Sequence, residues 1–79
     1  MALMQIFQLN DTLEPGKQAK ATLLKWSNNT YMSRGGQAVI VYSYAGSHGI
    51  PGDRGYCILG DSGRWEVVGS LVNEQMLGG

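Results

Sequence analysis

The sequence predicts an all-β fold: a small antiparallel barrel or sandwich of about five to six short strands. Short runs of β-branched and aromatic residues recur along the 79 residues, and turn sequences rich in glycine separate them. No region repeats its apolar residues with the 3.6-residue period of a long amphipathic helix. A chain of this length forms one domain at most.

The start of the chain is apolar and alternates loosely. One side of an extended segment over residues 1–9 would carry Met4 and Ile6, and the other Leu3, Phe7 and Leu9. Two alternatives remain open: the segment is the first barrel strand, or it is an arm that adds a strand to a neighbour's sheet. Residues 1–13 are therefore expected to be an N-terminal strand or arm, residues 14–72 the barrel or sandwich domain, and residues 73–79 a flexible tail.

Two turns frame a predicted hairpin in the first half of the chain. Residues 14–17 read Glu-Pro-Gly-Lys, in which proline fixes φ at the second position and glycine tolerates a positive φ at the third. Residues 18–26 follow as a strand, and the turn at 27–29 leads into a second strand at 30–32. A further break is expected at residues 33–36, which read Ser-Arg-Gly-Gly.

The strongest strand signal is at residues 38–42, which are apolar on both faces. Such a strand lies in a closed core or shows one face to another chain. A glycine-rich surface loop follows at 45–54, and residues 56–59 and 64–68 form the last predicted hairpin. Gly63 is free to take the left-handed position of its turn. The predicted core consists of Trp26, Val39, Val41, Ile58, Trp65 and Val67.

Composition excludes several kinds of site. Cys57 is the only cysteine and His48 the only histidine, so neither an internal disulfide nor a compact His/Cys metal site forms, and no cofactor is expected. Six basic and six acidic residues give a formal net charge of zero, which argues against nucleic acid as a partner. The apolar start is too short to cross a membrane and has no signal-peptide pattern.

The residue types for a catalytic triad occur near one another in the glycine-rich loop, as Ser47, His48 and Asp53. Crowding of residue types is not evidence of an aligned nucleophile and base, so the chain is predicted not to be an enzyme. A second alternative is an aromatic platform for nucleic acid, formed by Arg34-Gly35-Gly36 with Tyr31, Tyr42 and Tyr44. Because the chain has no basic excess, the favoured interpretation is that the tyrosines are strand residues at the edge of the core.

Three stretches occur in a particular order: Ala21-Thr22-Leu23-Leu24-Lys25-Trp26, then Gly52-Asp53-Arg54-Gly55-Tyr56, then Asp61-Ser62-Gly63-Arg64-Trp65-Glu66-Val67-Val68. This order, over about residues 19–68, resembles a short segment that recurs in virion structural proteins of tailed bacteriophages. The resemblance implies a small β domain in an assembled particle, such as a cement, fibre or tail-tip component. It implies no catalytic residues.

The expected function is therefore that of a non-enzymatic virion structural protein, assembled in the host cytoplasm, and most specifically a capsid cement or decoration protein. Its partners would be the major capsid protein or other virion subunits, with a homo-oligomer, first a trimer, expected on the particle. Charged residues make up only 15% of the chain, which suits a partly covered surface. The alternative is a cytoplasmic small-barrel module that binds nucleic acid or a peptide. The candidate subunit-binding residues are Leu3, Met4, Ile6, Phe7, Leu9, His48, Ile50 and Arg54.

Overall fold

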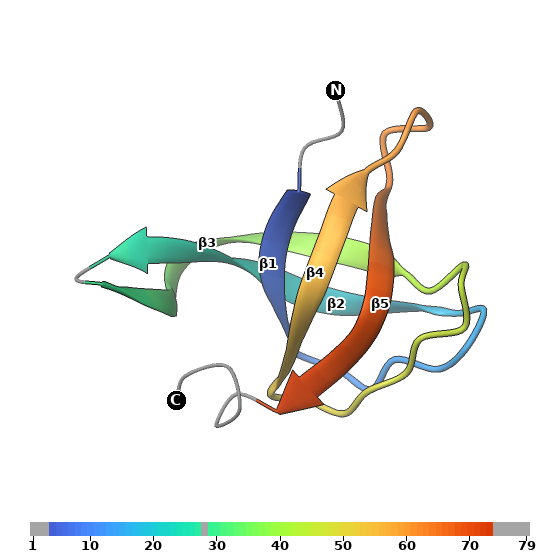
Figure 1. The fold of residues 1–79 in the computed structure, drawn as a ribbon, viewed down its shortest axis with the longest axis horizontal. Coiled ribbons are helices and arrows are strands. Elements are labelled where there is room, and N and C mark those ends of the chain that lie inside the picture. The colour runs from blue at the N-terminus through green and yellow to red at the C-terminus, as the bar shows by residue number, and fades with distance from the viewer. Residues whose placement is uncertain (1–3, 28, 74–79) are drawn as a thin grey trace.

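The five strands of the protein close into a single barrel in the order β1-β2-β3-β5-β4 (Figure 1). The computed structural model describes residues 4–27 and 29–73. The all-β barrel predicted from the sequence is confirmed. The strands are β1 (Met4–Leu9), β2 (Gln18–Ser27), β3 (Thr30–Tyr42), β4 (Asp53–Leu59) and β5 (Trp65–Asn73).

The topology is a Greek key closed by one further strand. β1, β2 and β3 follow one another as neighbours, and β4 returns over a long connection to lie beside β1. β5 then fills the gap between β4 and β3. A closed ring with an odd number of strands cannot alternate in direction throughout, so one pairing must be parallel.

That parallel pairing is β3 with β5, through Val41↔Trp65 and Tyr42↔Glu66. The other four pairings are antiparallel, as the sequence predicted. The β3–β5 pairing, the parallel seam of the barrel, differs in direction from the antiparallel pairing that the sequence predicted. The seam is short, because β3 ends where β5 begins to run alongside it.

Side chains brace this short seam from outside the ladder. A nitrogen of Arg64 (Nη1) donates to the hydroxyl of Tyr44 at 2.9 Å, and the guanidinium carbon lies 5.1 Å from the ring centroid of Tyr42. The two tyrosine rings are stacked, with centroids 5.7 Å apart. The hydrogen bond to Tyr44, and the electrostatic interaction with Tyr44 and Tyr42, raise the pKa of Arg64 above its ordinary value, so the guanidinium stays charged. Arg64 therefore links the β4–β5 hairpin to the end of β3.

The predicted turns form as expected. The Lys17 N–H donates to the Glu14 carbonyl at 3.0 Å, and Gly16 has a φ of +75°. In the β4–β5 hairpin, the Gly63 N–H donates to Gly60 at 3.0 Å, and the φ of Gly63 is +81°. This is the left-handed position assigned to Gly63 from the sequence.

The predicted break at residues 33–36 is wrong, because β3 runs through it. The pairing of β3 with β2 shifts register here, between Leu23↔Gln37 and Lys25↔Met32. The extra residues of β3 are absorbed as an irregularity opposite Leu24. The hairpin of β2 and β3 then extends past the barrel wall (Figure 1).

The core lies inside the barrel and consists of one side of each strand. Phe7, Val41 and Cys57 are fully buried, and Leu13 joins them from the β1–β2 connection. The buried core cluster is Phe7, Leu9, Leu13, Ala19, Ala21, Leu23, Val41, Cys57 and Val67, with Val39, Trp65 and Leu71 packed against it.

Four of the six predicted core residues belong to this core or pack on it: Val39, Val41, Trp65 and Val67. Ile58 is a wrong assignment, because its neighbour Cys57 points inward and successive side chains of a strand point to opposite faces. The side chain of Trp26 lies outside the described part of the structure.

β1 is an integral strand of the barrel. It pairs with β2 on one side, through Phe7↔Leu23, and with β4 on the other, through Gln5↔Cys57. Phe7 is 0% exposed and Leu9 is 1% exposed. Of the two alternatives, Met4–Leu9 is therefore the first strand of the barrel and not an arm. Leu3 and the predicted tail from residue 74 lie outside the described residues.

The connection from β3 to β4 covers one end of the barrel. Gly49 and Leu13 exchange two backbone hydrogen bonds, of 2.9 and 3.0 Å. A Cβ at Gly49 would lie 2.8 Å from Cδ2 of Leu71 and 2.9 Å from Cδ1 of Leu9, so a larger residue would have to displace these side chains. The glycine-rich loop is thus fastened over the core rather than free of it.

Replacing Phe7 with Ala is expected to lower the free energy of unfolding by about 3–5 kcal/mol, because it leaves a cavity at the centre of the barrel. Met4→Ala, three residues earlier on the outer side of the same strand, is the matched control and should cost less than about 1 kcal/mol. Urea titration followed by tryptophan fluorescence measures both. Equal, small losses for the two variants would show that β1 is not part of the barrel.

Candidate functional site

The outer side of β1, β4 and β5 carries a continuous apolar surface. Cross-strand pairing sets its members side by side, with Met4 opposite Ile58 and Ile6 opposite Tyr56. Tyr56 is in turn opposite Val68 of β5. Side chains directly opposite on neighbouring strands share a face and contact one another. We call these five residues, Met4, Ile6, Tyr56, Ile58 and Val68, the outer apolar face.

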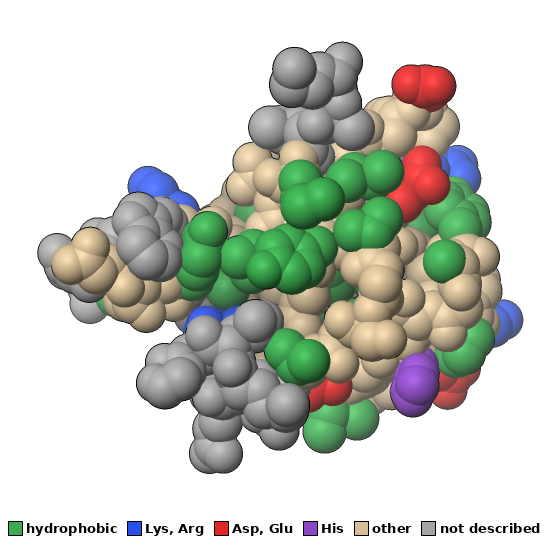
Figure 2. All heavy atoms as spheres, in the orientation of Figure 1, with side chains coloured by type: hydrophobic (Ala, Val, Ile, Leu, Met, Phe, Trp, Pro, Cys, Tyr) green, Lys and Arg blue, Asp and Glu red, His purple; other side chains and the backbone are tan. Residues whose placement is uncertain are grey.

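This surface exists because both sides of these strands are apolar. Phe7, Cys57 and Val67 point into the core, so the residues beside them must point outward. Met4 remains 58% exposed and Tyr56 remains 42% exposed. Figure 2 shows the hydrophobic side chains gathered over the three strands.

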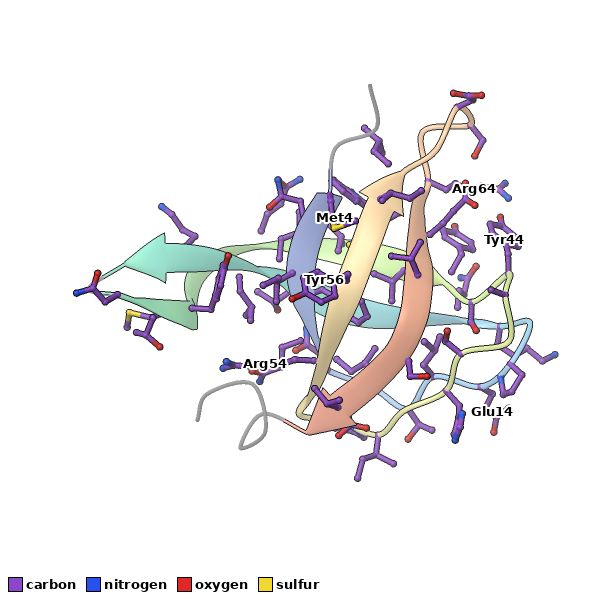
Figure 3. The ribbon with its side chains drawn as sticks, in the orientation of Figure 1. Met4, Glu14, Tyr44, Arg54, Tyr56 and Arg64 are labelled. Atoms are coloured by element: carbon purple, nitrogen blue, oxygen red, sulfur yellow. The ribbon has the colours of Figure 1, made fainter. Side chains whose placement is uncertain are left out.

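Polar and charged groups lie at the margins of the outer apolar face and not in its middle. At one end, Nε of Arg54 donates to Oε1 of Gln8 at 3.0 Å, which fixes the guanidinium beside the apolar side chains. At the other end, Glu66 is the β5 neighbour of Ile58. Figure 3 shows Met4, Tyr56 and Arg54 in sequence along this side of the barrel. An apolar centre with a polar rim is the arrangement found in protein–protein interfaces.

A second surface is an open groove of about 990 Å³ at the covered end of the barrel. Residues 12–15, residues 45–50 and residues 69–71 line it, together with Asp53. Two of the predicted binding residues lie here: His48 is exposed, and Ile50 is 63% exposed.

The three residue types of a triad meet in this groove but do not form one. Oγ of Ser47 donates to the Gly69 carbonyl at 2.6 Å, and the Asp53 carboxylate accepts from the Ile50 N–H at 3.0 Å. Both side chains thus form hydrogen bonds with backbone groups and do not orient His48. Among the described residues, no three His, Cys, Asp or Glu side chains are grouped to hold a metal ion.

The predicted binding residues fall in three places. Met4 and Ile6 are on the outer apolar face, with Arg54 at its rim. His48 and Ile50 are in the groove. Phe7 and Leu9 are in the core and are not available to a partner.

Sequence reasoning missed Tyr56, Ile58 and Val68 as surface residues. The available signal was alternation: residues 54–58 place an apolar side chain on the outward side of β4 where an isolated barrel would carry a polar one. The prediction of Ile58 as a core residue rests on alternation, which does not say which side of the strand faces inward.

Cys57 carries the only thiol of the chain, and its surroundings suppress its reactivity. The thiol is fully buried, and desolvation raises the pKa of Cys57 to about 12. The thiolate is the reactive form, so the group is inert at neutral pH.

The fold and this surface define the protein as a small closed β-barrel with an apolar outer face. Comparison with protein-family models, with curated proteins and with solved structures finds no match. Within the described residues there is no helix long and apolar enough to span a membrane.

Alkylation of Cys57 by iodoacetamide is expected to be at least about a hundredfold slower in the native protein than in urea at pH 8, because little thiolate forms at a pKa near 12. A thiol whose pKa is raised in the native state stabilises that state below its ordinary pKa of 9.0 and loses this contribution as the pH rises toward about 12. Native alkylation as fast as that of the unfolded chain would contradict the buried placement.

Proposed function

We propose that this chain is a non-enzymatic structural protein of a virion, which binds other capsid or tail subunits and acts most specifically as a capsid cement or decoration protein. The major capsid protein is the partner of first choice. The observation that carries the proposal is the outer apolar face, together with the resemblance of residues 19–68 to a segment of phage virion proteins.

The energetics support a covered surface. Full burial of an apolar side chain contributes about 1.5–3 kcal/mol. Met4 is 58% exposed and Tyr56 42% exposed, so covering what remains of both supplies about 1.5–3 kcal/mol together. Charged residues, which would oppose burial, stay at the rim as Arg54 and Glu66. The chain also has no internal disulfide available, since it has one cysteine. A barrel of this size gains stability when another subunit covers part of it.

Tyr56→Lys is expected to weaken binding to particles at least about tenfold, because a charge replaces an aromatic anchor in the middle of the outer apolar face. The measurement is the amount of tagged chain that co-sediments with purified virus particles, prepared from the cells in which this chain is encoded. Ile50→Lys places the same charge on the groove and is the matched comparison. If Ile50→Lys abolishes binding and Tyr56→Lys does not, the groove and not the outer apolar face contacts the particle.

A second candidate function is a small-barrel module for single-stranded nucleic acid or a peptide. Five-stranded Greek-key barrels of the OB type bind single strands on aromatic side chains. The stack of Tyr42, Tyr44 and Arg64 favours this candidate, since Tyr44 is 57% exposed. The formal net charge of zero opposes it.

Titration with a single-stranded oligonucleotide separates the two candidates. We expect no binding in the micromolar range at about 50 mM salt, because the chain has no basic excess with which to release counterions. Fluorescence anisotropy of a labelled oligonucleotide measures it, and Tyr44→Ala tests the stack. Affinity that falls steeply with added salt and is lost in Tyr44→Ala would establish nucleic-acid binding instead.

A further inference from the structure

The charges at the rim of the outer apolar face are of opposite sign and lie at opposite ends. Glu66 is the cross-strand neighbour of Ile58 at one end, and Arg54 is the neighbour of Gln8 at the other. Tyr56 lies in the row between them, which is uncharged. The surface thus runs from negative through apolar to positive along the strand direction.

A surface of this kind is complementary to itself. A row here means the residues that are cross-strand neighbours on β1, β4 and β5. Two copies can face each other across a two-fold axis that lies in the interface and runs along these rows, perpendicular to the strands. The row containing Glu66 in one copy then faces the row containing Arg54 in the other. Neighbouring strands are about 4.8 Å apart, and an arginine side chain spans that distance. The same operation forms both charge pairs and sets the two Tyr56 rows against each other. Such self-complementarity is the requirement for a two-fold interface.

A three-fold ring has a different requirement. Each subunit then needs two distinct surfaces that fit each other. The groove at the barrel end is lined by Glu14 and Asp53 without a lysine or arginine, and it does not fit the outer apolar face as a second, complementary surface. The geometry therefore favours two-fold over three-fold pairing.

We propose that the outer apolar face binds a second copy of this chain, as a two-fold dimer in which Arg54 of each subunit lies beside Glu66 of the partner subunit. This inference rests on the proposed function, because it names the occupant of the same surface. The second copy is then the neighbouring subunit that covers this face on the particle.

The size of the surface sets the strength of the dimer. Three strands about 4.8 Å apart and a few residues long give a contact of roughly 300 Å² per subunit. A standard stable interface buries about 800 Å² on each side. The dimer is therefore weak in free solution, with a dissociation constant in the micromolar to millimolar range. Attachment to a particle raises its occupancy through effective concentration.

Charge reversal tests the inference by sedimentation velocity over a wide range of protein concentrations. Wild-type protein should show a monomer–dimer equilibrium. Arg54→Glu and Glu66→Arg should each weaken it about tenfold, because like charges then meet across the interface. The double variant restores opposite charges and should recover affinity to within about threefold of wild type. Lys20→Glu, an exposed charge reversal on β2, is the matched control and should change nothing.

Three outcomes would overturn the dimer: wild-type protein that stays monomeric at millimolar concentration, a trimer, or a dimer that neither single reversal weakens. Circular dichroism of each variant separates loss of association from loss of fold. Particle binding is measured separately, by co-sedimentation of the wild-type chain with particles. A monomeric wild type that still binds particles would remove the dimer and leave the proposed function in place, whereas a dimer that binds no particle would do the reverse.

Discussion

Closure of the barrel is the constraint on which the rest of the structure depends. Once the five strands form a ring, each has one side committed to an interior of fixed width. Small residues such as Ala21, Gly55 and Cys57 line that interior around Phe7, the largest fully buried side chain. The ring also forces one parallel seam, because an odd number of strands cannot alternate. The stack of Arg64 on Tyr42 and Tyr44 reinforces the place where the ladder is shortest.

Closure of the barrel also explains why the outer apolar face is exposed. In an open sheet, a strand with two apolar sides can be covered by a second layer of the same chain. Here the interior takes one side, and the described chain provides no second layer over β1, β4 and β5 (Figure 1). Met4 and Tyr56 therefore stay in water until another molecule covers them. That molecule is, in our proposal, a neighbouring subunit.

The sequence predicted the features that depend on local chemistry. The turns around Gly16 and Gly63, the inward side of Val39 and Val41, and the all-β class follow from turn residues and alternation.

The sequence did not predict the features that depend on residues distant in the chain. Alternation says that Cys57 and Ile58 face opposite sides but not which is inside, and Ile58 is outside since Cys57 faces Val67. Residues 33–36 look like a break locally, yet pairing with β2 carries the strand through them. The candidate site was half predicted for the same reason, with Met4 and Ile6 anticipated and their β4 neighbours missed.

The most direct test of the central claim is hydroxyl-radical footprinting of the free chain and of the chain in assembled particles, read out by mass spectrometry. Methionine and tyrosine are readily oxidised, so Met4 and Tyr56 report on the outer apolar face, while Tyr44 reports on an unrelated exposed surface. The account predicts strong protection of Met4 and Tyr56 on assembly, with Tyr44 as reactive as before. Met4 and Tyr56 that stay as reactive in the particle as in the free chain would contradict it.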